Sequence, residues 1–413
     1  MIRAFKFIKI AKYRWLVFLL TLAISLLALR YMSMPYVWML LVWGLFFFLL
    51  FLTAKKTAGK VACFNIALLV FLLGCLEFAF SDLVTSFLNK SPLVTADASN
   101  QKTKQVEFVS TSDKDFYYRH PVLGYAPTPN NVIRHTETYP DGHHLEAVYT
   151  INSDGLRIAC PPAQEKKIYD ESVIFFGCSF TFGEAVNDDE TLPYLFGKYS
   201  DWNYRVYNFG FEGYGPHQML AALENGIVTD IVQESPKVIV YHGIMDHVYR
   251  VAGGHSWIKY GPKYALQNGD LVQVGHFDDD KTPFVERQLL KSFVYKKIAD
   301  GLSRKMLSEQ EAAELLIEIV AASKNNIEQR YPDSEFVVLL WDKWKNEDPA
   351  LSQCYDQIID QLRKKGISVH EVKSIIPTYA QERDKFLVRN NGHPNPLAYD
   401  KIAEFISKLM AEE

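Results

Sequence analysis

The sequence predicts an α/β domain in three layers, with a central parallel sheet covered by helices on both faces. From residue 172 onward, short continuous apolar runs alternate with longer amphipathic segments. Apolar runs of this kind are typical of strands buried on both faces, and their alternation with helices predicts a parallel sheet. The predicted strands are 172–177, 205–208, 238–242, 336–341 and 367–369, and the predicted helices are 191–199, 216–233, 308–330, 350–365 and 396–411.

Composition narrows the function classes. Of the 413 residues, 22% are charged and 48% are hydrophobic, which fits an ordered protein with a sizeable core. The formal net charge of -4 gives no reason to expect a nucleic-acid partner. The five cysteines include no Cys-x-x-Cys pair, and the histidines do not combine with acids at a ligand spacing. We therefore expect no metal and no other cofactor. One bridge, Cys160 to Cys354, remains open.

Residues 1–82 predict a membrane anchor with about three transmembrane helices. Apolar stretches run over 15–29, 36–53 and 61–80, and a spanning helix needs ~20 mostly apolar residues. Basic residues precede the first stretch and follow the second. The positive-inside rule then predicts a multi-pass protein of the inner membrane, with its main domain on the periplasmic or extracytoplasmic side. A cleaved signal peptide is the alternative explanation of the first stretch.

Three regions follow the predicted anchor. Residues 83–115 are polar and lack periodicity, as is typical of a flexible linker. Residues 116–165 contain Pro, Asn and Gly turn signals and predict a small β-rich segment packed on the main domain, 166–413. Within that domain, residues 250–300 are rich in Gly, His and aromatic residues and predict an irregular insertion, the kind of loop that often carries specificity.

Ser179 is the candidate nucleophile. It follows Gly177, which ends the first predicted strand, and such strand ends are where open α/β sheets present catalytic groups. A lone Gly-x-Ser more often contains a serine that only caps the next helix. Cys178 could also attack as a thiolate, although a thiol ionises only in an electropositive setting.

Three later blocks favour the catalytic interpretation of Ser179. Asn208-Phe-Gly-Phe-Glu-Gly213 follows the second strand, and glycine N–H groups there could bind an oxyanion. The third strand leads into Gly243-Ile-Met-Asp-His247. His393 precedes the last helix, whose start is marked by Asn395 as N-cap and a proline after it.

These blocks resemble those of the SGNH, or GDSL-like, hydrolases, and the β-rich segment resembles that of membrane-anchored bacterial members. The resemblance covers residues 170–410 and is carried by 177–183, 208–215 and 393–395. It implies a flavodoxin-like sheet and a serine hydrolase. In such an enzyme Ser179 would be the nucleophile, His393 its base, and the N–H groups of Ser179 and Gly213 the oxyanion donors.

The chain departs from the family pattern at the residue that orients the histidine. Asn390 stands where the family has an aspartate, three positions before His393. We predict that Asn390 takes this role, because an amide oxygen can accept the imidazole N–H, although it cannot stabilise the imidazolium by charge. Asp384 and Asp246 are the alternative carboxylates.

Two further departures lie nearer the nucleophile. Cys178 replaces the usual aspartate, and Met245 replaces the asparagine that donates to the oxyanion. His242, His247 or a loop group would have to supply the missing donor. Asp246 and His247 are therefore candidates for contacting substrate or orienting the catalytic groups.

The favoured hypothesis is an exported, membrane-anchored serine esterase or O-acyltransferase that works through an acyl-serine intermediate. Its expected substrate is an acylated carbohydrate or another ester, above all O-acetyl groups of cell-surface carbohydrate, and Trp257, Tyr260 and Tyr264 could stack on sugar rings. A lipase or lysophospholipase is the second hypothesis. A catalytically inactive carbohydrate-binding or assembly protein is the third, favoured by Met245 and Asn390. The sequence leaves the oligomeric state open.

Overall fold

The computed structural model describes residues 43–44, 47, 61–62, 64–72, 105–110, 114–278, 307–341 and 349–411. The chain divides into two compact units, one of residues 1–100 and 281–305 and the other of residues 101–280 and 306–413. In the first unit, residues 61–62 and 64–72 are helical. No helix within the described ranges is both long and apolar enough to cross a bilayer. The predicted span 15–29, most of 36–53, and residues 63 and 73–80 of the third predicted span lie outside these ranges.

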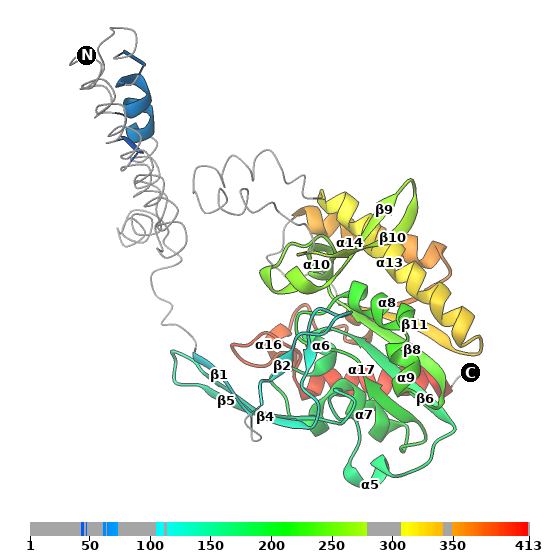
Figure 1. Cartoon of the computed structure of the whole chain (residues 1–413). Helices are drawn as coiled ribbons and strands as arrows, with labels where there is room; N and C mark the ends of the chain where they lie inside the picture. Colours follow the sequence, from blue (N-terminus) through cyan, green and yellow to red (C-terminus); the bar gives the residue numbers. More distant parts are fainter. Residues whose placement is uncertain are drawn as a thin grey trace, which may run out of the picture. The chain divides into compact units, whose positions relative to one another are not determined.

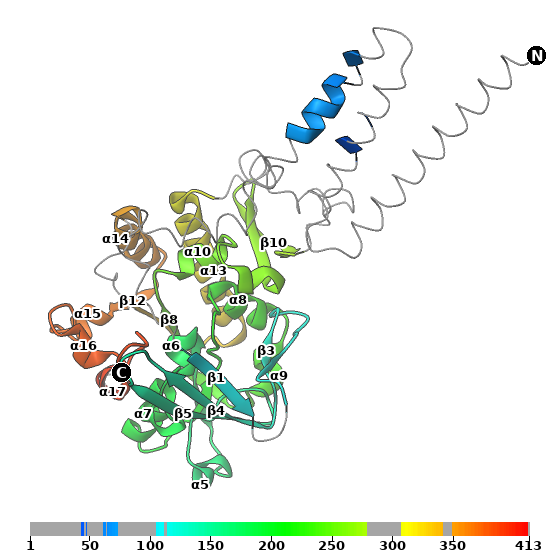
Figure 2. The same cartoon turned by 90° about the vertical axis from the view of Figure 1, so that its left-hand side faces the viewer.

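The second unit contains the predicted parallel sheet, with five strands in the order β12-β11-β8-β6-β7 (Figures 1 and 2). Every neighbouring pair is parallel. The strands are β6 (Glu171–Gly177), β7 (Arg205–Asn208), β8 (Ser235–Gly243), β11 (Glu335–Leu340) and β12 (Ser368–Glu371). All five predicted strands are confirmed. Their apolar runs are too short for helices, and runs of this length form buried strands.

Helices cover both faces of this sheet and create two cores. In β6, Ile174 and Phe176 join one core while Val173 and Phe175 join the other, as the alternation of strand side chains requires. The first core is closed by α8 (Pro216–Glu224), α9 (Ile227–Ile231), α13 (Glu309–Arg330) and α14 (Pro349–Lys364), and the second by α7 (Leu192–Tyr199) and α17 (Pro396–Ala411). The predicted three-layer α/β/α class is therefore correct.

The predicted helix 216–233 is two helices. It ends as α8 at Glu224 and resumes as α9 at Ile227, with Gly226 between them at a φ of 78°. A residue in the left-handed region cannot continue an α-helix, and glycine adopts this conformation without a steric penalty. The Asn225-Gly226 pair was the sequence signal for this break.

The β-rich segment forms an antiparallel sheet in the order β1-β4-β5. Its strands are β1 (Gln105–Ser110), β4 (Asn131–Thr138) and β5 (His144–Ile151), and β2 (Tyr117–Tyr118) pairs with β3 (Ala126–Pro127) nearby. β1 lies inside the predicted linker 83–115. It is a strand because its backbone bonds to the edge of β4, a long-range contact that a polar sequence does not reveal.

The described part of the insertion is more regular than predicted. It begins within α10 (His247–Val251) and contains a 3-10 helix η2 (Ser256–Tyr260) and the antiparallel hairpin β9 (Pro262–Gln267) and β10 (Asp270–His276). Asn268 and Gly269 connect the two strands, both with positive φ. An Asn-Gly pair between strands is a strong hairpin signal, and it was present in the sequence.

Candidate active site

Ser179 opens a short helix directly after the first strand. β6 ends at Gly177, and α6 (Ser179–Phe182) begins two residues later. A Cβ on Gly177 would lie 2.7 Å from the backbone oxygen of His242, so only glycine allows the chain to turn here. Ser179 itself is 6% exposed. The turn thus holds the hydroxyl at the carboxyl edge of the parallel sheet.

His393 reaches this hydroxyl from the other end of the chain. It lies in the loop between α16 (Arg383–Phe386) and α17, and its Nε2 is 2.8 Å from Ser179 Oγ. Asn395 caps α17 by accepting the N–H of Ala398 at 3.1 Å, in agreement with the predicted N-cap. Residues 214 positions apart in sequence are therefore within hydrogen-bonding distance.

The asparagine that contacts His393 Nδ1 is Asn391, and the prediction of Asn390 at this place is corrected. The Nδ1–H of His393 can donate to Asn391 Oδ1 at 2.5 Å, and the backbone N–H of His393 donates to the same oxygen at 3.2 Å. Asn390 has a φ of 62° and donates from its side chain to Asp141 Oδ2 at 3.0 Å. The left-handed backbone at position 390 directs that side chain elsewhere, so the family spacing does not carry over.

Glu184 is a site residue that the sequence analysis missed. Its Oε2 lies 3.3 Å from His393 Nε2, on the side of the imidazole that also faces Ser179. A carboxylate here favours the protonated imidazole. Glu184 belongs to no recognised motif, and its position depends on the loop that follows α6.

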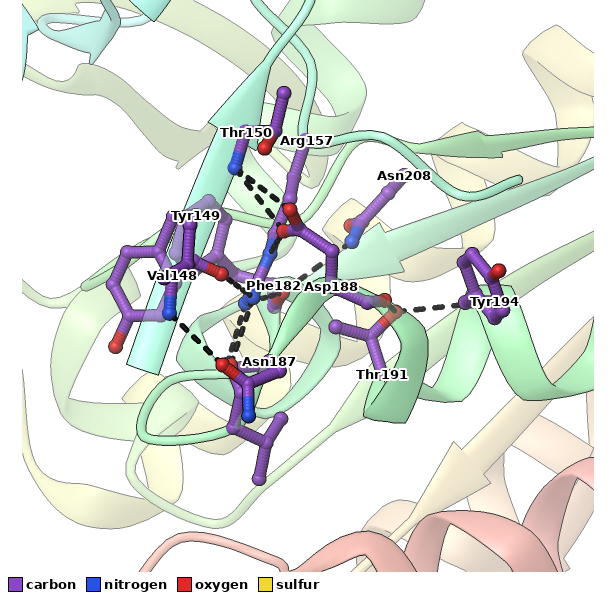
Figure 3. A network of polar contacts seen from close by, with 12 residues as sticks. Val148, Tyr149, Thr150, Arg157, Phe182, Asn187, Asp188, Thr191, Tyr194 and Asn208 are labelled. Carbon is purple, nitrogen blue, oxygen red and sulfur yellow. Dashed lines mark hydrogen bonds and ion pairs between the residues drawn. The ribbon is translucent and has the colours of Figure 1, made fainter. Parts of the chain in front are cut away.

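That loop is held by a buried arginine (Figure 3). Arg157 is 1% exposed and pairs through Nε with Asp188 at 2.8 Å. Asp188 in turn accepts the N–H of Thr150 on β5. The two terminal nitrogens of Arg157 donate at 2.6–2.9 Å to the backbone oxygens of Val148, Phe182, Gly183 and Val186. One side chain therefore ties the β-rich segment to both ends of the loop that carries Glu184.

The two predicted oxyanion donors remain available. Across the described ranges, the N–H groups of Ser179 and Gly213 make no hydrogen bond to the rest of the chain. Asn208 links the loops that carry them: it donates to the backbone oxygen of Thr181 at 3.2 Å and accepts the N–H of Gly210 at 3.1 Å. Gly213 has a φ of 74°, and a Cβ there would lie 2.5 Å from the hydroxyl of Tyr125. Glycine is thus required at position 213.

Met245 and the two neighbouring histidines lie in the interior. Met245 is 2% exposed in the first core. His242 contacts Thr181 Oγ1 through Nδ1 at 3.2 Å and accepts from Trp341, and burial lowers its pKa to about 3. His247 shares a hydrogen bond of 2.6 Å with the Tyr241 hydroxyl, and burial lowers its pKa well below the usual value. Both imidazoles are therefore neutral and bonded within the core.

Asp246 anchors a second buried arginine, Arg250. Their ion pair measures 2.7 Å, and Arg250 Nη1 donates to the backbone oxygen of Tyr214 at 2.5 Å. The guanidinium also lowers the pKa of the Cys178 thiol, although burial, the larger effect, raises it. A fixed positive charge thus lies beside residues adjacent to both Ser179 and Gly213. Arg250 carried no motif that could have identified it.

Cys178 is not placed to act as the nucleophile. Its side chain is fully buried, and the net effect of its surroundings raises the pKa of the thiol. A buried neutral thiol is unreactive. Cys160 and Cys354 are free thiols, so the bridge left open by the sequence is absent.

Trp257 is the predicted aromatic residue that borders the site. It is 48% exposed, and its indole nitrogen lies 2.8 Å from where a Cβ on Gly213 would be. It stacks on His255 with ring centroids 4.1 Å apart, and His255 pairs with Asp246 at 2.8 Å. Tyr264, in contrast, is 4% exposed and donates to Glu224, so it is not available for stacking on a sugar.

No family model matches this sequence, and no curated protein does either. Solved structures do match. They include a lipolytic protein of the G-D-S-L family from Desulfitobacterium hafniense, with a TM-score of 0.34, 12% identity, and coverage of 58% of this chain and 99% of that one. A GDSL-like lipase from Parabacteroides merdae has a TM-score of 0.33 and 10% identity, covering 59% of this chain and 97% of that one. A variant of an acetyl xylan esterase from Geobacillus stearothermophilus has a TM-score of 0.33 and 13% identity, covering 59% and 96%.

Proposed function

We propose that this protein is a serine ester hydrolase or O-acyltransferase that forms an acyl-serine intermediate at Ser179. One observation carries the proposal: Ser179 Oγ lies 2.8 Å from His393 Nε2, while His393 Nδ1 lies 2.5 Å from Asn391 Oδ1. A nucleophile, its base and a group that orients the base are the three parts that serine catalysis requires. His393 is partly exposed, so a substrate can approach this pair.

The reaction follows from these contacts. His393 Nε2 takes the hydroxyl proton as Ser179 Oγ bonds to the acyl carbon, and the carbonyl electrons move to oxygen. When the tetrahedral intermediate collapses, the ester C–O bond breaks and the leaving alcohol takes the proton from His393. Water or another hydroxyl then attacks the acyl-serine by the same route. The acceptor that reaches this intermediate decides between hydrolysis and transfer.

The N–H groups of Ser179 and Gly213 are the proposed oxyanion donors. Fixed donors aimed at developing charge supply much of the rate in such sites, and losing one typically costs about 100- to 1000-fold. Met245 cannot donate, so a hydroxyl, amide or cation must compensate. Arg250 is the candidate, because its buried positive charge lies beside Tyr214 and Cys178, next to the two donor residues.

An acylated carbohydrate is the proposed substrate class. Trp257 supports it, because an exposed indole beside Gly213, held by stacking on His255, offers a flat apolar face to a sugar ring. O-acetyl groups of cell-surface carbohydrate are the specific proposal.

A membrane anchor with the catalytic domain outside the cytoplasm is part of the same proposal. The helical residues 61–62 and 64–72 expose large apolar side chains, which soluble proteins rarely cluster on their surfaces (Val61, Phe64, Ile66, Leu68, Leu69, Phe71 and Leu72). The basic residues near the amino terminus support the orientation. A reporter fused after Asp82 tests this. Activity confined to the cytoplasm would exclude export.

The central test is Ser179→Ala in the full-length chain. We expect it to reduce hydrolysis of p-nitrophenyl acetate by at least ~1000-fold, because no other hydroxyl is paired with His393 in the proposed mechanism. A fluorophosphonate probe should label the wild type at Ser179. Cys178→Ala is the matched control and should retain turnover and labelling.

Substrate choice is measured with the same two proteins. Acetate release from acetylated xylo-oligosaccharides should exceed hydrolysis of long-chain lipid esters and should disappear in Ser179→Ala. A preference for the lipid esters would favour a lipase. Equal slow turnover by wild type and Ser179→Ala would instead point to a binding or assembly protein and refute the proposed activity.

A further inference from the structure

A buried carboxylate lies directly behind Asn391. Glu137 is the second-last residue of β4 and is 1% exposed. Its two oxygens accept from Asn391 Nδ2 at 3.0 and 3.1 Å, across 254 positions of sequence. The β-rich segment thus contributes a charged side chain next to the catalytic loop.

This contact determines which end of the amide faces His393. A carboxylate only accepts hydrogen bonds, so the amide nitrogen must turn toward Glu137. The amide oxygen is then left facing the imidazole, where it accepts from His393 Nδ1. That bond places the remaining ring nitrogen, Nε2, without its hydrogen toward Ser179, which is the tautomer a general base needs.

The other neighbours of Glu137 also suit an ionised carboxyl group. Tyr139 donates its hydroxyl hydrogen to Glu137, and burial followed by this hydrogen bond raises the pKa of Tyr139, so the donor stays protonated. His135 Nε2 lies 3.2 Å from Glu137 Oε1. The hydroxyl of Tyr149 accepts the N–H of Ala185 at 2.9 Å and contacts His135 Nδ1, to which it can give its own hydrogen. Nε2 then carries the hydrogen of the neutral imidazole, but it makes no hydrogen bond to Glu137 within the described residues.

Taking a carboxylate out of water is costly, so a buried carboxylate must gain a compensating interaction. The activation of Ser179 provides such an interaction. When His393 takes the hydroxyl proton it becomes a cation, and the neutral amide of Asn391 cannot balance that charge. Hydrogen bonds in a chain polarise one another, and in the interior the field of a nearby carboxylate is weakly screened.

We propose that Glu137 is a positioning residue for the Ser179–His393 pair, which fixes the Asn391 amide and provides, one group further back, the negative charge that balances the imidazolium. The inference rests on the proposed function. It makes the β-rich segment part of the catalytic apparatus. Glu184 faces Nε2, the imidazole nitrogen that does not contact Asn391. Glu212 and Arg157 are the other titratable groups near these carboxylates, and burial raises the pKa of Glu212 well above its usual value.

The test is Glu137→Gln in the full-length chain, which keeps the side-chain shape and removes the charge. We expect kcat to fall by about 10- to 100-fold with KM nearly unchanged, as for other losses of catalytic alignment. The acid limb of kcat/KM against pH should move to lower pH, because less negative charge favours the neutral imidazole. Glu146→Gln is the matched control. Glu146 lies on β5 of the same hairpin, is exposed and pairs with Arg134, and its substitution should change neither quantity.

A double variant separates charge from structure. Asn391→Asp added to Glu137→Gln moves the carboxylate to the position beside His393, and the new amide at 137 can donate to it. We expect this variant to recover most of the lost kcat. Tyr139→Phe removes one donor to Glu137 and is a milder perturbation for the case that Glu137→Gln does not fold. It should lower kcat by less than Glu137→Gln, and an unchanged kcat would refute the role of Glu137.

The outcomes are distinct. If Ser179→Ala is inactive while Glu137→Gln keeps the wild-type kcat and pH profile, the role of Glu137 is refuted and the proposed function stands. The role is also refuted if Glu137→Gln lowers kcat but Asn391→Asp does not restore any of it. If Ser179→Ala is as active as the wild type, the proposed function itself fails.

Discussion

Two adjacent asparagines differ in what their side chains contact. Asn391 bonds to His393 on one side and Glu137 on the other, while Asn390 bonds to Asp141 at the surface. The pKa of the Asp141 carboxyl is below its usual value, mainly because the N–H of His143 donates to it, with the Asn390 amide second. Asn390 therefore fastens the loop to the β4–β5 turn, and Asn391 contacts the base.

This difference predicts a large loss of kcat for one substitution and almost none for the other. Asn391→Ala should lower kcat for p-nitrophenyl acetate by about 100-fold or more, because the imidazole loses the acceptor that sets its tautomer. Asn390→Gly should leave kcat within about twofold, since the surface contact that it removes contributes little. Glycine is chosen at 390 because it adopts the φ of 62° that alanine does not. Equal losses in the two variants would argue against a specific role for Asn391.

Among the secondary-structure elements, the short helix α6 has little stability of its own. It spans four residues and is held by its neighbours rather than by helix propensity. Asn208 ties it to the glycine loop after β7, and Arg157 ties its carboxyl end to β5. The position of Ser179 thus depends on two polar side chains from elements far from it in sequence.

Arg157→Met tests this dependence. The substitution keeps much of the side-chain volume but removes the donor to four backbone oxygens and the ion-pair partner of Asp188, which should lower the free energy of unfolding by about 3 kcal/mol. Urea denaturation measures the loss. Arg134→Met is the control, because Arg134 is exposed and its ion pair with Glu146 should contribute less than ~1 kcal/mol. A loss in Arg157→Met no larger than the control would contradict the assigned role.

For the whole molecule, buried histidines make stability depend on pH. Burial lowers the pKa of His242 to about 3 and, with a smaller effect of Arg250, that of His217 to about 3. In the unfolded chain a histidine titrates near pH ~6.5. Between these values the unfolded chain binds protons that the folded protein does not, so folding becomes less favourable as pH falls.

We therefore expect the free energy of unfolding to decrease steadily from pH 6.5 toward pH 3, with no contribution from these groups above pH 6.5. Urea denaturation at a series of pH values measures the slope. His217→Gln should make the slope shallower by up to one proton, because it removes one of the groups responsible. His144→Gln, at an exposed position, should leave the slope unchanged. Parallel curves for wild type and His217→Gln would contradict the argument.

The sequence by itself determined the strands of the central sheet, most of its helices and the two residues of the proposed catalytic pair. Continuous apolar runs such as 172–177 can be satisfied only as buried strands, and the glycine, serine and histidine signals at their ends are local. The resemblance of short sequence blocks to the SGNH hydrolases then suggested Ser179 and His393, whose Oγ and Nε2 atoms the structure brings to 2.8 Å. Local hydrogen-bonding and steric requirements were enough for these features.

Only the tertiary structure decided which groups surround that pair. Whether Asn390 or Asn391 faces the imidazole depends on the left-handed backbone of positions 390 and 392. Glu137 and Arg250 approach the site from other segments, and a contact across 254 positions leaves no trace in local spacing. The physical reason is that burial, charge pairing and the fit of side chains are properties of the assembled core, and they are not encoded within any one stretch of the chain.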